Sequence, residues 1–157
     1  MRIVVFSDSH GNVDILRQIM QSQPEAEAII HLGDGERDFD QLRLEHPDKV
    51  MRNVRGNSDW GSESKLMDTV LLEGKRIIFA HGHTLNVKQS PSMLLGEAQS
   101  AGAQIALFGH THYSMTDYKD GVYLMNPGSP TQPRRGRATY GVIDIGPEGI
   151  ATKIIPL

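Results

Sequence analysis

The sequence predicts an α/β protein in which two mixed β-sheets pack face to face, with helices outside. Three features support this prediction. Short apolar runs alternate with amphipathic segments in the first third of the chain, hairpin signals dominate the rest, and polar clusters follow the apolar runs. Because the 157 residues contain no internal repeat or linker, residues 1–157 are expected to form a single domain.

The first third of the chain predicts strands alternating with helices. Arg2 to Phe6 is a β-branched apolar run typical of a strand. Asn12 is the expected N-cap of a helix that stops before Pro24, because the apolar residues between them recur at helical spacing. The pattern then predicts a strand, a helix and a strand over residues 28–32, 38–45 and 50–54.

The remainder predicts hairpins and one further helix. Glu73-Gly74-Lys75 joins two expected strands, 67–72 and 76–80, as a hairpin turn. Residues 91–101 have a helical pattern, and Gly102 is the expected stop of that helix. Further strands are expected over residues 104–108, 113–118, 122–125, 140–145 and 150–155, with a turn at Asp120-Gly121.

Composition disfavours several classes of protein. With 38% hydrophobic and 22% charged residues, neither disorder nor a membrane protein is indicated, and no apolar run approaches the roughly 18 residues that span a bilayer. The net charge of −3 gives no global attraction for nucleic acid. Cysteine is absent and no export signal is visible, so the cytoplasm is the expected location.

One basic cluster interrupts this acidic background. Arg134, Arg135 and Arg137 surround Gly136. The cluster is either a solvated loop or an anion-binding rim for a substrate phosphate, and the sequence leaves both interpretations open.

Five polar clusters follow the expected strands: Asp8-Ser9-His10, Gly33-Asp34, Gly56-Asn57, His81-Gly82-His83 and Gly109-His110-Thr111-His112. Alternating residues, as in Asp-x-His, can both reach one metal ion when the loop bends, and the flanking glycines permit such bends. Each cluster alone could be a capping turn, an ordinary turn or a pair of buried histidines. Together, their carboxylate, amide and imidazole groups indicate a site for divalent cations without thiolate ligands.

Two histidines fall outside these clusters. His31 lies inside an expected strand and is predicted to be a core residue or a support for the site. His46 stands beside Pro47 and is predicted to lie in a surface loop.

The order of the five clusters resembles that of the calcineurin-like metallophosphoesterases, especially the small bacterial and archaeal phosphodiesterases of the YfcE type. The segment Asn126-Pro127-Gly128-Ser129, followed by Pro133-Arg134, is also similar to that subgroup. The resemblance covers essentially the whole chain. It implies a four-layer α/β/β/α sandwich with the site at the carboxyl ends of the strands.

The resemblance also implies two divalent metal ions per chain. Asp34 would bridge the two ions; Asp8, His10 and His112 would complete the first site, and Asn57, His81 and His110 the second. Mn²⁺ is the expected metal, although Ni²⁺, Fe²⁺, Zn²⁺ and Mg²⁺ also match these ligand types. Asn57, His81 and His83 are the expected catalytic residues. His83 is not a ligand: it either contacts phosphate or orients the site, or it is a purely structural histidine.

The implied reaction is hydrolysis of a phosphodiester by a hydroxide that two metal ions activate, with a small phosphate ester as substrate. Two alternatives stay open: a phosphomonoesterase, and a non-catalytic protein-binding scaffold like the cargo-recognition subunit of the eukaryotic retromer. In that scaffold the histidine of Asp-x-His is replaced, whereas His10 is present here. No nucleic-acid or membrane partner is expected, and homo-oligomer formation is left open.

One departure from the superfamily concerns the leaving group. Many members follow Gly-Asn with a histidine that touches phosphate and helps protonate the departing oxygen, but here Ser58 and Asp59 follow Asn57. Serine is a poor acid, so the leaving group lacks an evident proton donor. Asp59 and His83 are the remaining candidates for that role.

Overall fold

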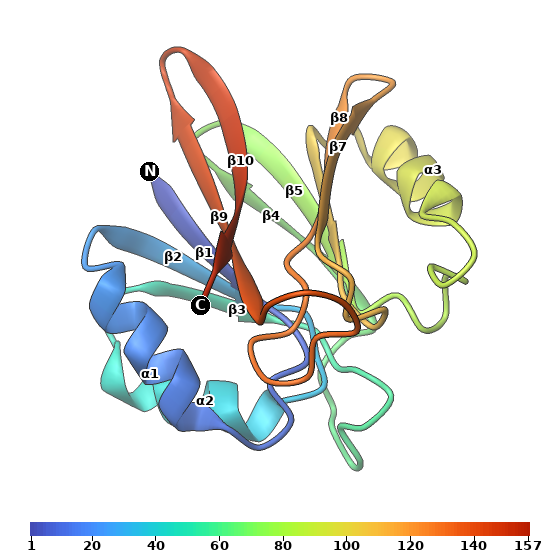
Figure 1. Ribbon diagram of the computed structural model, residues 1–157. Helices are drawn as coiled ribbons and strands as arrows, with labels where there is room; N and C mark the ends of the chain where they lie inside the picture. Colours follow the sequence, from blue (N-terminus) through green and yellow to red (C-terminus); the bar gives the residue numbers. More distant parts are fainter.

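Two mixed five-stranded sheets form the centre of the computed structural model, which describes residues 1–157 (Figure 1). The first sheet has the order β10-β9-β1-β2-β3 and the second β4-β5-β6-β8-β7. The strands of the first sheet are β1 (Arg2–Phe6), β2 (Ala26–His31), β3 (Val50–Asn53), β9 (Thr139–Gly146) and β10 (Gly149–Pro156). Those of the second are β4 (Met67–Leu72), β5 (Lys75–Ala80), β6 (Ile105–Phe108), β7 (Met115–Lys119) and β8 (Val122–Asn126).

Three helices cover the outer faces of the two sheets. The helices α1 (Val13–Ser22) and α2 (Glu36–Glu45) pack on the first sheet, and α3 (Ser92–Ala101) packs on the second (Figure 1). The layers therefore follow the order α/β/β/α, which confirms the predicted fold class.

The core has three parts because the central strands are buried on both faces. In β1, Ile3 and Val5 join the cluster between the two sheets, whereas Val4 and Phe6 join the cluster beneath α1 and α2. All four side chains are fully buried. Burying such a side chain contributes roughly 1.5–3 kcal/mol, so β1 anchors the sheets and the helix layer together.

Helix α1 begins and helix α3 ends at the residues that local sequence signals predict. Asn12 caps α1 by accepting a hydrogen bond from the N–H of Ile15 at 3.2 Å. Gly102 ends α3 with φ of 65°, in the left-handed conformation that glycine adopts easily. The helix expected from residue 38 begins two residues earlier, at Glu36, because a carboxylate from a distant loop caps it, as described below.

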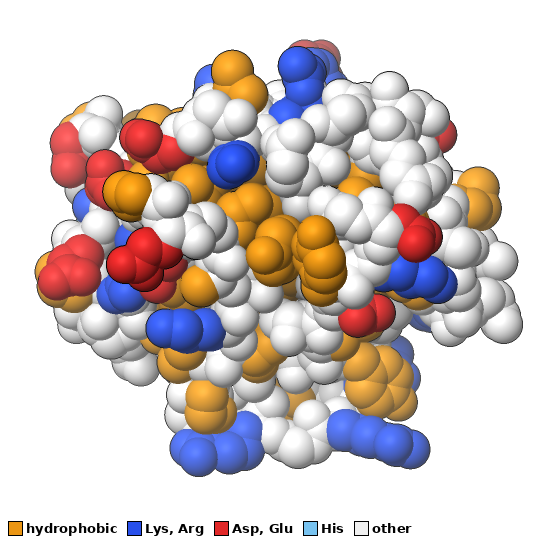
Figure 2. All heavy atoms as spheres, turned by 90° about the horizontal axis from the view of Figure 1, so that it is seen from above, with side chains coloured by type: hydrophobic (Ala, Val, Ile, Leu, Met, Phe, Trp, Pro, Cys, Tyr) orange, Lys and Arg blue, Asp and Glu red, His pale blue; other side chains and the backbone are white.

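The topology gathers the five polar clusters at one end of the molecule. Strands β1, β2 and β3 are parallel in the first sheet, and β5 and β6 are parallel in the second. The loops that follow these strands meet at the lower side of Figure 1. The opposite end, seen from above in Figure 2, shows hydrophobic side chains near its centre and no histidine. None of the three helices has the length and apolar composition needed to cross a membrane.

Candidate metal centre

Two glycines bring the loops after β2 and β3 into direct contact. A Cβ atom added to Gly33 would lie 2.4 Å from the backbone N of Gly56, and one added to Gly56 would lie 2.1 Å from Asp34 Oδ1. Both distances are far inside van der Waals contact, so neither position accepts a side chain without rearrangement. This close approach places Asp34 and Asn57 next to each other.

Five of the polar residues adopt the left-handed backbone conformation, with φ between 47° and 67°: Asp8, His10, Asp34, His110 and His112. For residues other than glycine this conformation costs roughly 1–2 kcal/mol each. Such strain persists only where the surrounding structure imposes it, and it concentrates at functional sites. The bent loops turn alternate side chains, such as Asp8 and His10, toward the same point.

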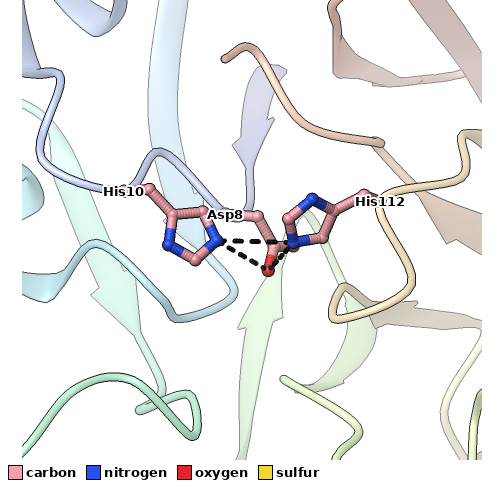
Figure 3. A group of neighbouring side chains, drawn as sticks. All are labelled: Asp8, His10 and His112. Carbon is pink, nitrogen blue, oxygen red and sulfur yellow. Dashed lines mark hydrogen bonds and ion pairs between the residues drawn. The ribbon is translucent and has the colours of Figure 1, made fainter. Parts of the chain in front are cut away.

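Asp8, His10 and His112 form one group of converging donors (Figure 3). His112 Nε2 lies 3.1 Å and His10 Nε2 3.9 Å from Asp8 Oδ1. Asp8 Oδ2 accepts hydrogen bonds from Ser7 Oγ and from the N–H of His110, whereas Asp8 Oδ1 is buried without a hydrogen-bond partner. An unsatisfied carboxylate oxygen surrounded by imidazole nitrogens is a suitable ligand for a divalent cation.

Asp8, Asp34 and His81 form a second group. His81 Nδ1 donates to the backbone oxygen of Leu32 at 2.8 Å, so Nε2 of the neutral ring carries a lone pair. That lone pair faces oxygens only: Asn57 Oδ1 at 3.0 Å, Asp34 Oδ2 at 3.4 Å and Asp8 Oδ1 at 3.9 Å. A cation at this point, either a proton or a metal ion, makes this arrangement favourable.

His110 and His83 complete the cluster around His81. The ring centroids lie 5.0 Å apart for His81 and His110, and 5.3 Å apart for His81 and His83. His83 Nδ1 is buried without a hydrogen-bond partner. Burial lowers the pKa of His110 to about 4 and also lowers the pKa of His83. Both rings are therefore neutral near pH 7, with a lone pair free to bind a metal or to accept a proton.

The electrostatic field of the site favours positive charge. Burial lowers the pKa of His81, but Asp34 and Asp8 outweigh it and raise that pKa above its ordinary value. Asp8, whose carboxylate lies 3.1 Å from His112 Nε2, likewise raises the pKa of His112. Burial opposes ionisation of Asp34, yet His81 and Ser58 hold its pKa well below the usual range. Ionised carboxylates that attract protons to imidazoles also attract divalent metal ions.

Asp59 holds the loop of Asp34 in place. Asp59 Oδ2 accepts hydrogen bonds from the N–H groups of Asp34 at 2.8 Å and Gly56 at 2.7 Å, and Oδ1 accepts from Gly35 and Glu36 at 3.0 and 3.1 Å. Although burial opposes it, these four donors lower the pKa of Asp59. An ionised carboxylate with four donors is no proton donor, so the suggestion that Asp59 protonates the leaving group is wrong.

Asp59 is the residue that the sequence interpretation missed as a positioning group. The available signal was its place two residues after Asn57, since aspartate after a turn commonly accepts backbone N–H groups. The distant partners at the start of α2 could not be read from the sequence.

Ser58 contacts Asp34 directly. Its backbone N–H donates to Asp34 Oδ1 at 2.8 Å, and its hydroxyl donates to Asp34 Oδ2 at 3.1 Å. Ser58 therefore orients the Asp34 carboxylate, and its hydroxyl proton is already engaged.

A buried relay joins the loops after β1 and β2 to α2. The N–H of Gly33 donates to His31 Nδ1 at 3.1 Å, His31 Nε2 donates to Ser9 Oγ at 3.0 Å, and Ser9 Oγ donates to Asp38 at 2.6 Å. The N–H of Gly11 also donates to Asp38, at 3.0 Å. His31 is fully buried, and burial lowers its pKa to about 4, so the ring is neutral. Its two hydrogen bonds connect the loops that carry Asp8 and Asp34.

The remaining predicted residues lie outside the two donor groups. His46 is half-buried at the carboxyl end of α2. Arg134, Arg135 and Arg137 are exposed, and they differ in their contacts. The backbone N–H of Arg134 donates to the backbone oxygen of His112, whereas Arg137 bonds the backbone oxygen of Leu157. Arg134 is thus the arginine tied to a residue of the candidate centre.

Residues 1–148 match the calcineurin-like phosphoesterase superfamily domain. The chain belongs to this superfamily. It is 32% identical to a probable metallophosphoesterase of Bacillus subtilis, YsnB, with 92% of this chain and 85% of the relative covered. It is 26% identical to the phosphodiesterase YfcE of Escherichia coli, with 92% and 88% covered. These matches confirm the resemblance inferred from the order of the polar clusters, and they support a metal-dependent hydrolase.

Solved structures of the superfamily share this fold. A predicted phosphoesterase of Streptococcus pneumoniae superimposes with a TM-score of 0.86 at 28% identity, covering 99% of this chain and 88% of that one. The Vps29 protein of Entamoeba histolytica, solved with zinc, superimposes with a TM-score of 0.76 at 17% identity, covering 99% of both chains. At that identity the likeness to Vps29 concerns the fold alone.

Proposed function

We propose that the protein is a phosphodiesterase that works with two divalent metal ions. In this proposal Asp34 would be a ligand of both ions; Asp8, His10 and His112 would hold the first, and Asn57, His81 and His110 the second. The observation that carries the proposal is the buried Asp8 Oδ1, which has no hydrogen-bond partner and faces the Nε2 atoms of His10, His81 and His112. A structural carboxylate in a protein core would be satisfied by donors.

When bound, two divalent cations lower the pKa of a water molecule for attack on phosphorus and offset the negative charge of the phosphate oxygens. The chain's own residues prepare the site for that chemistry. Ser58 and Asp59 fix the Asp34 carboxylate and its backbone. The bonds from His81 Nδ1 to Leu32 and from His112 Nδ1 to Gln132 hold both rings with Nε2 directed into the site.

His83 acts on the substrate and not on the metals in this proposal. Its ring lies against His81 and His110, and it is neutral because burial lowers its pKa. A neutral imidazole with an unsatisfied Nδ1 can exchange a proton or a hydrogen bond with a bound phosphate. His83 is therefore the candidate contact to the phosphate group.

The donor set restricts the metal to borderline or hard divalent ions. Three carboxylate or amide side chains and four imidazoles suit Mn²⁺, our first choice, and also Fe²⁺, Ni²⁺, Zn²⁺ and Mg²⁺.

A non-catalytic protein-binding scaffold is the second candidate function, since relatives named vacuolar protein sorting-associated protein 29 share this fold. The full donor set favours catalysis. His10 is present, its Nε2 lies 3.4 Å from His112 Nε2, and all seven proposed ligands retain side chains that can bind a metal. A scaffold that needed no metal would gain nothing from five strained residues in these loops.

The experiment that separates these functions is a grid of metals against substrates on protein stripped with a chelator. Each divalent ion is added to samples containing bis(p-nitrophenyl) phosphate or p-nitrophenyl phosphate, and release of p-nitrophenol is measured. The proposal expects metal-dependent cleavage, with the diester cleaved faster than the monoester. Preference for the monoester would indicate a phosphomonoesterase, and no cleavage with any metal would favour the scaffold.

A further inference from the structure

An open cleft of about 550 Å³ adjoins the candidate metal centre. His10 and Asp34, two of the proposed metal ligands, are among the residues that line it. One wall is the start of α2, including Arg37. The other is the loop after β3, which carries Trp60; the backbone of this loop projects at the lower edge of Figure 1. A cleft of this volume falls in the range of small-molecule sites. An ester held at the metal centre therefore has this cleft beside it.

The side chain of Trp60 is unusually exposed for a tryptophan. Its side chain is 88% exposed, it is the only tryptophan of the chain, and no aromatic ring packs against it. The loop that carries it is held by internal bonds: the N–H of Trp60 donates to Ser58 at 3.0 Å, and Arg55 donates to the backbone oxygen of Ser62 at 3.1 Å. A fixed loop therefore presents a flat apolar surface to solvent beside the centre.

Arg37 supplies an unpaired positive charge to the cleft. The acidic side chains around it are already paired: Asp59 and Asp38 accept backbone N–H groups, Glu36 accepts from Asn53 at 3.2 Å, and Asp40 pairs with Arg43 at 3.4 Å. Arg37 is exposed and has no ion-pair or side-chain hydrogen-bond partner. Its five donors remain available to a ligand.

We propose that this cleft is a nucleoside subsite, in which Trp60 stacks on the base of a nucleotide-type phosphoester and Arg37 donates to the polar edge of that base. The proposal rests on the proposed function, because it places an ester arm of the substrate beside the metal centre. An exposed indole on a fixed loop is suited to planar rings, since stacking tolerates any base. A simple alkyl arm would use neither the indole nor the guanidinium.

The test measures binding without turnover, so that it does not depend on hydrolysis. Manganese-loaded full-length protein is titrated calorimetrically with the non-hydrolysable methylene phosphonate analogues of adenosine 5′-phosphate and of ribose 5-phosphate. The adenosine analogue should bind at least tenfold more tightly. Because Trp60 is the only tryptophan, its fluorescence, excited at 295 nm, should also quench saturably with the adenosine analogue and not with the ribose analogue.

Variants test whether Trp60 and Arg37 cause the preference for the adenosine analogue. Trp60→Ala should reduce the ratio of the two affinities to about twofold, and Trp60→Phe should preserve most of it. Arg37→Ala should weaken the adenosine analogue about fivefold. The matched control is Tyr118→Ala, which removes an aromatic side chain that is 61% exposed on β7 of the second sheet and should leave the ratio unchanged.

Equal affinity of the wild-type protein for the two analogues, or unaltered preference in Trp60→Ala, would overturn the subsite. Failure of the proposed function looks different. Hydrolysis of an aryl diester without adenosine preference rejects the subsite alone. Adenosine preference that depends on Trp60, in a protein that hydrolyses no ester, retains the subsite and rejects the phosphodiesterase.

Discussion

At the scale of single residues, several contacts hold the Asp34 carboxylate in the proposed centre. Ser58 bonds both of its carboxylate oxygens, Asp59 bonds its backbone, and His81 Nε2 lies 3.4 Å from Oδ2. Its pKa is held well below the ordinary value. Two cations at close range need a shared anion to offset their repulsion, and in the proposed assignment Asp34 is the carboxylate that supplies it.

Asp34→Asn should therefore empty the centre. The substitution keeps the size of the side chain but removes the charge, so we expect near-zero metal by elemental analysis after gel filtration. His46→Ala, which changes a histidine at the far end of α2, is the control and should leave the metal content unchanged. The ligand assignment would be refuted if Asp34→Asn kept its full metal content while His46→Ala lost its metal.

Asp59 stabilises the folded chain through four backbone donors. Asp59→Asn leaves one oxygen for four N–H groups, so at least two of them lose their acceptor. Hydrogen bonds to charged groups contribute about 1.5–3 kcal/mol each, and we expect a loss of at least ~2 kcal/mol in the free energy of unfolding by urea, measured without metal. Asp40→Asn, on the exposed face of α2, should cost no more than ~0.5 kcal/mol. Equal effects of the two substitutions would contradict the role of Asp59.

The hydroxyl of Ser58 is committed to Asp34, which leaves the departing oxygen without a donor at this position. We expect a steep dependence of rate on leaving-group pKa, with aryl diesters far faster than alkyl ones. General-acid assistance is typically worth 10²–10⁴-fold. Ser58→His should flatten the dependence, and Ser58→Ala should not. A shallow slope in the natural protein, measured over a graded series of diesters, would point to another donor, of which His83 is the candidate.

At the scale of elements, the buried relay through His31 couples β1, β2 and α2. His31 is neutral in the folded protein because burial lowers its pKa to about 4, whereas an unfolded histidine has a pKa near 6.5. Between these values the unfolded state binds a proton that the folded state does not. The His31 contribution to the free energy of unfolding therefore falls as pH falls from about 6.5 to 4, by up to about 1.4 kcal/mol per pH unit.

The substitution His31→Gln isolates this contribution. Glutamine cannot titrate, so the variant is expected to be less stable at pH 7 but to lose less of its stability on acidification. Urea unfolding of metal-free protein at pH 7, 6 and 5 measures the slope, and the other histidines contribute equally to both proteins. Parallel slopes would show that His31 is not held neutral by the fold.

At the scale of the whole molecule, the sequence predicts the sheets and helices well because their signals are local. The apolar run of β1, the N-cap at Asn12 and the stop at Gly102 each depend on a few neighbouring residues. The early start of α2 was missed because its cap, Asp59, lies more than 20 residues away.

The sequence predicts which residues form the candidate site, but not the backbone geometry that brings them together. Polar residues after parallel strands meet at one sheet edge, so the converging groups of Asp8, His10, Asp34, His81 and His112 could be anticipated. The left-handed backbone of these loops, the contact of Gly33 with Gly56 and the cleft beside Trp60 arise from long-range packing. No local pattern encodes them.

The central claim is that this fold assembles a two-metal hydrolytic centre, and a metal titration of stripped protein tests it most directly. Mn²⁺ is added stepwise to chelator-treated protein while bound metal, melting temperature and cleavage of bis(p-nitrophenyl) phosphate are measured together. We predict no activity without metal, saturation at two ions per chain, and a rise in melting temperature, because metal binds the folded state preferentially. Full activity in rigorously metal-free protein, or saturation at fewer than two ions per chain, would contradict the claim.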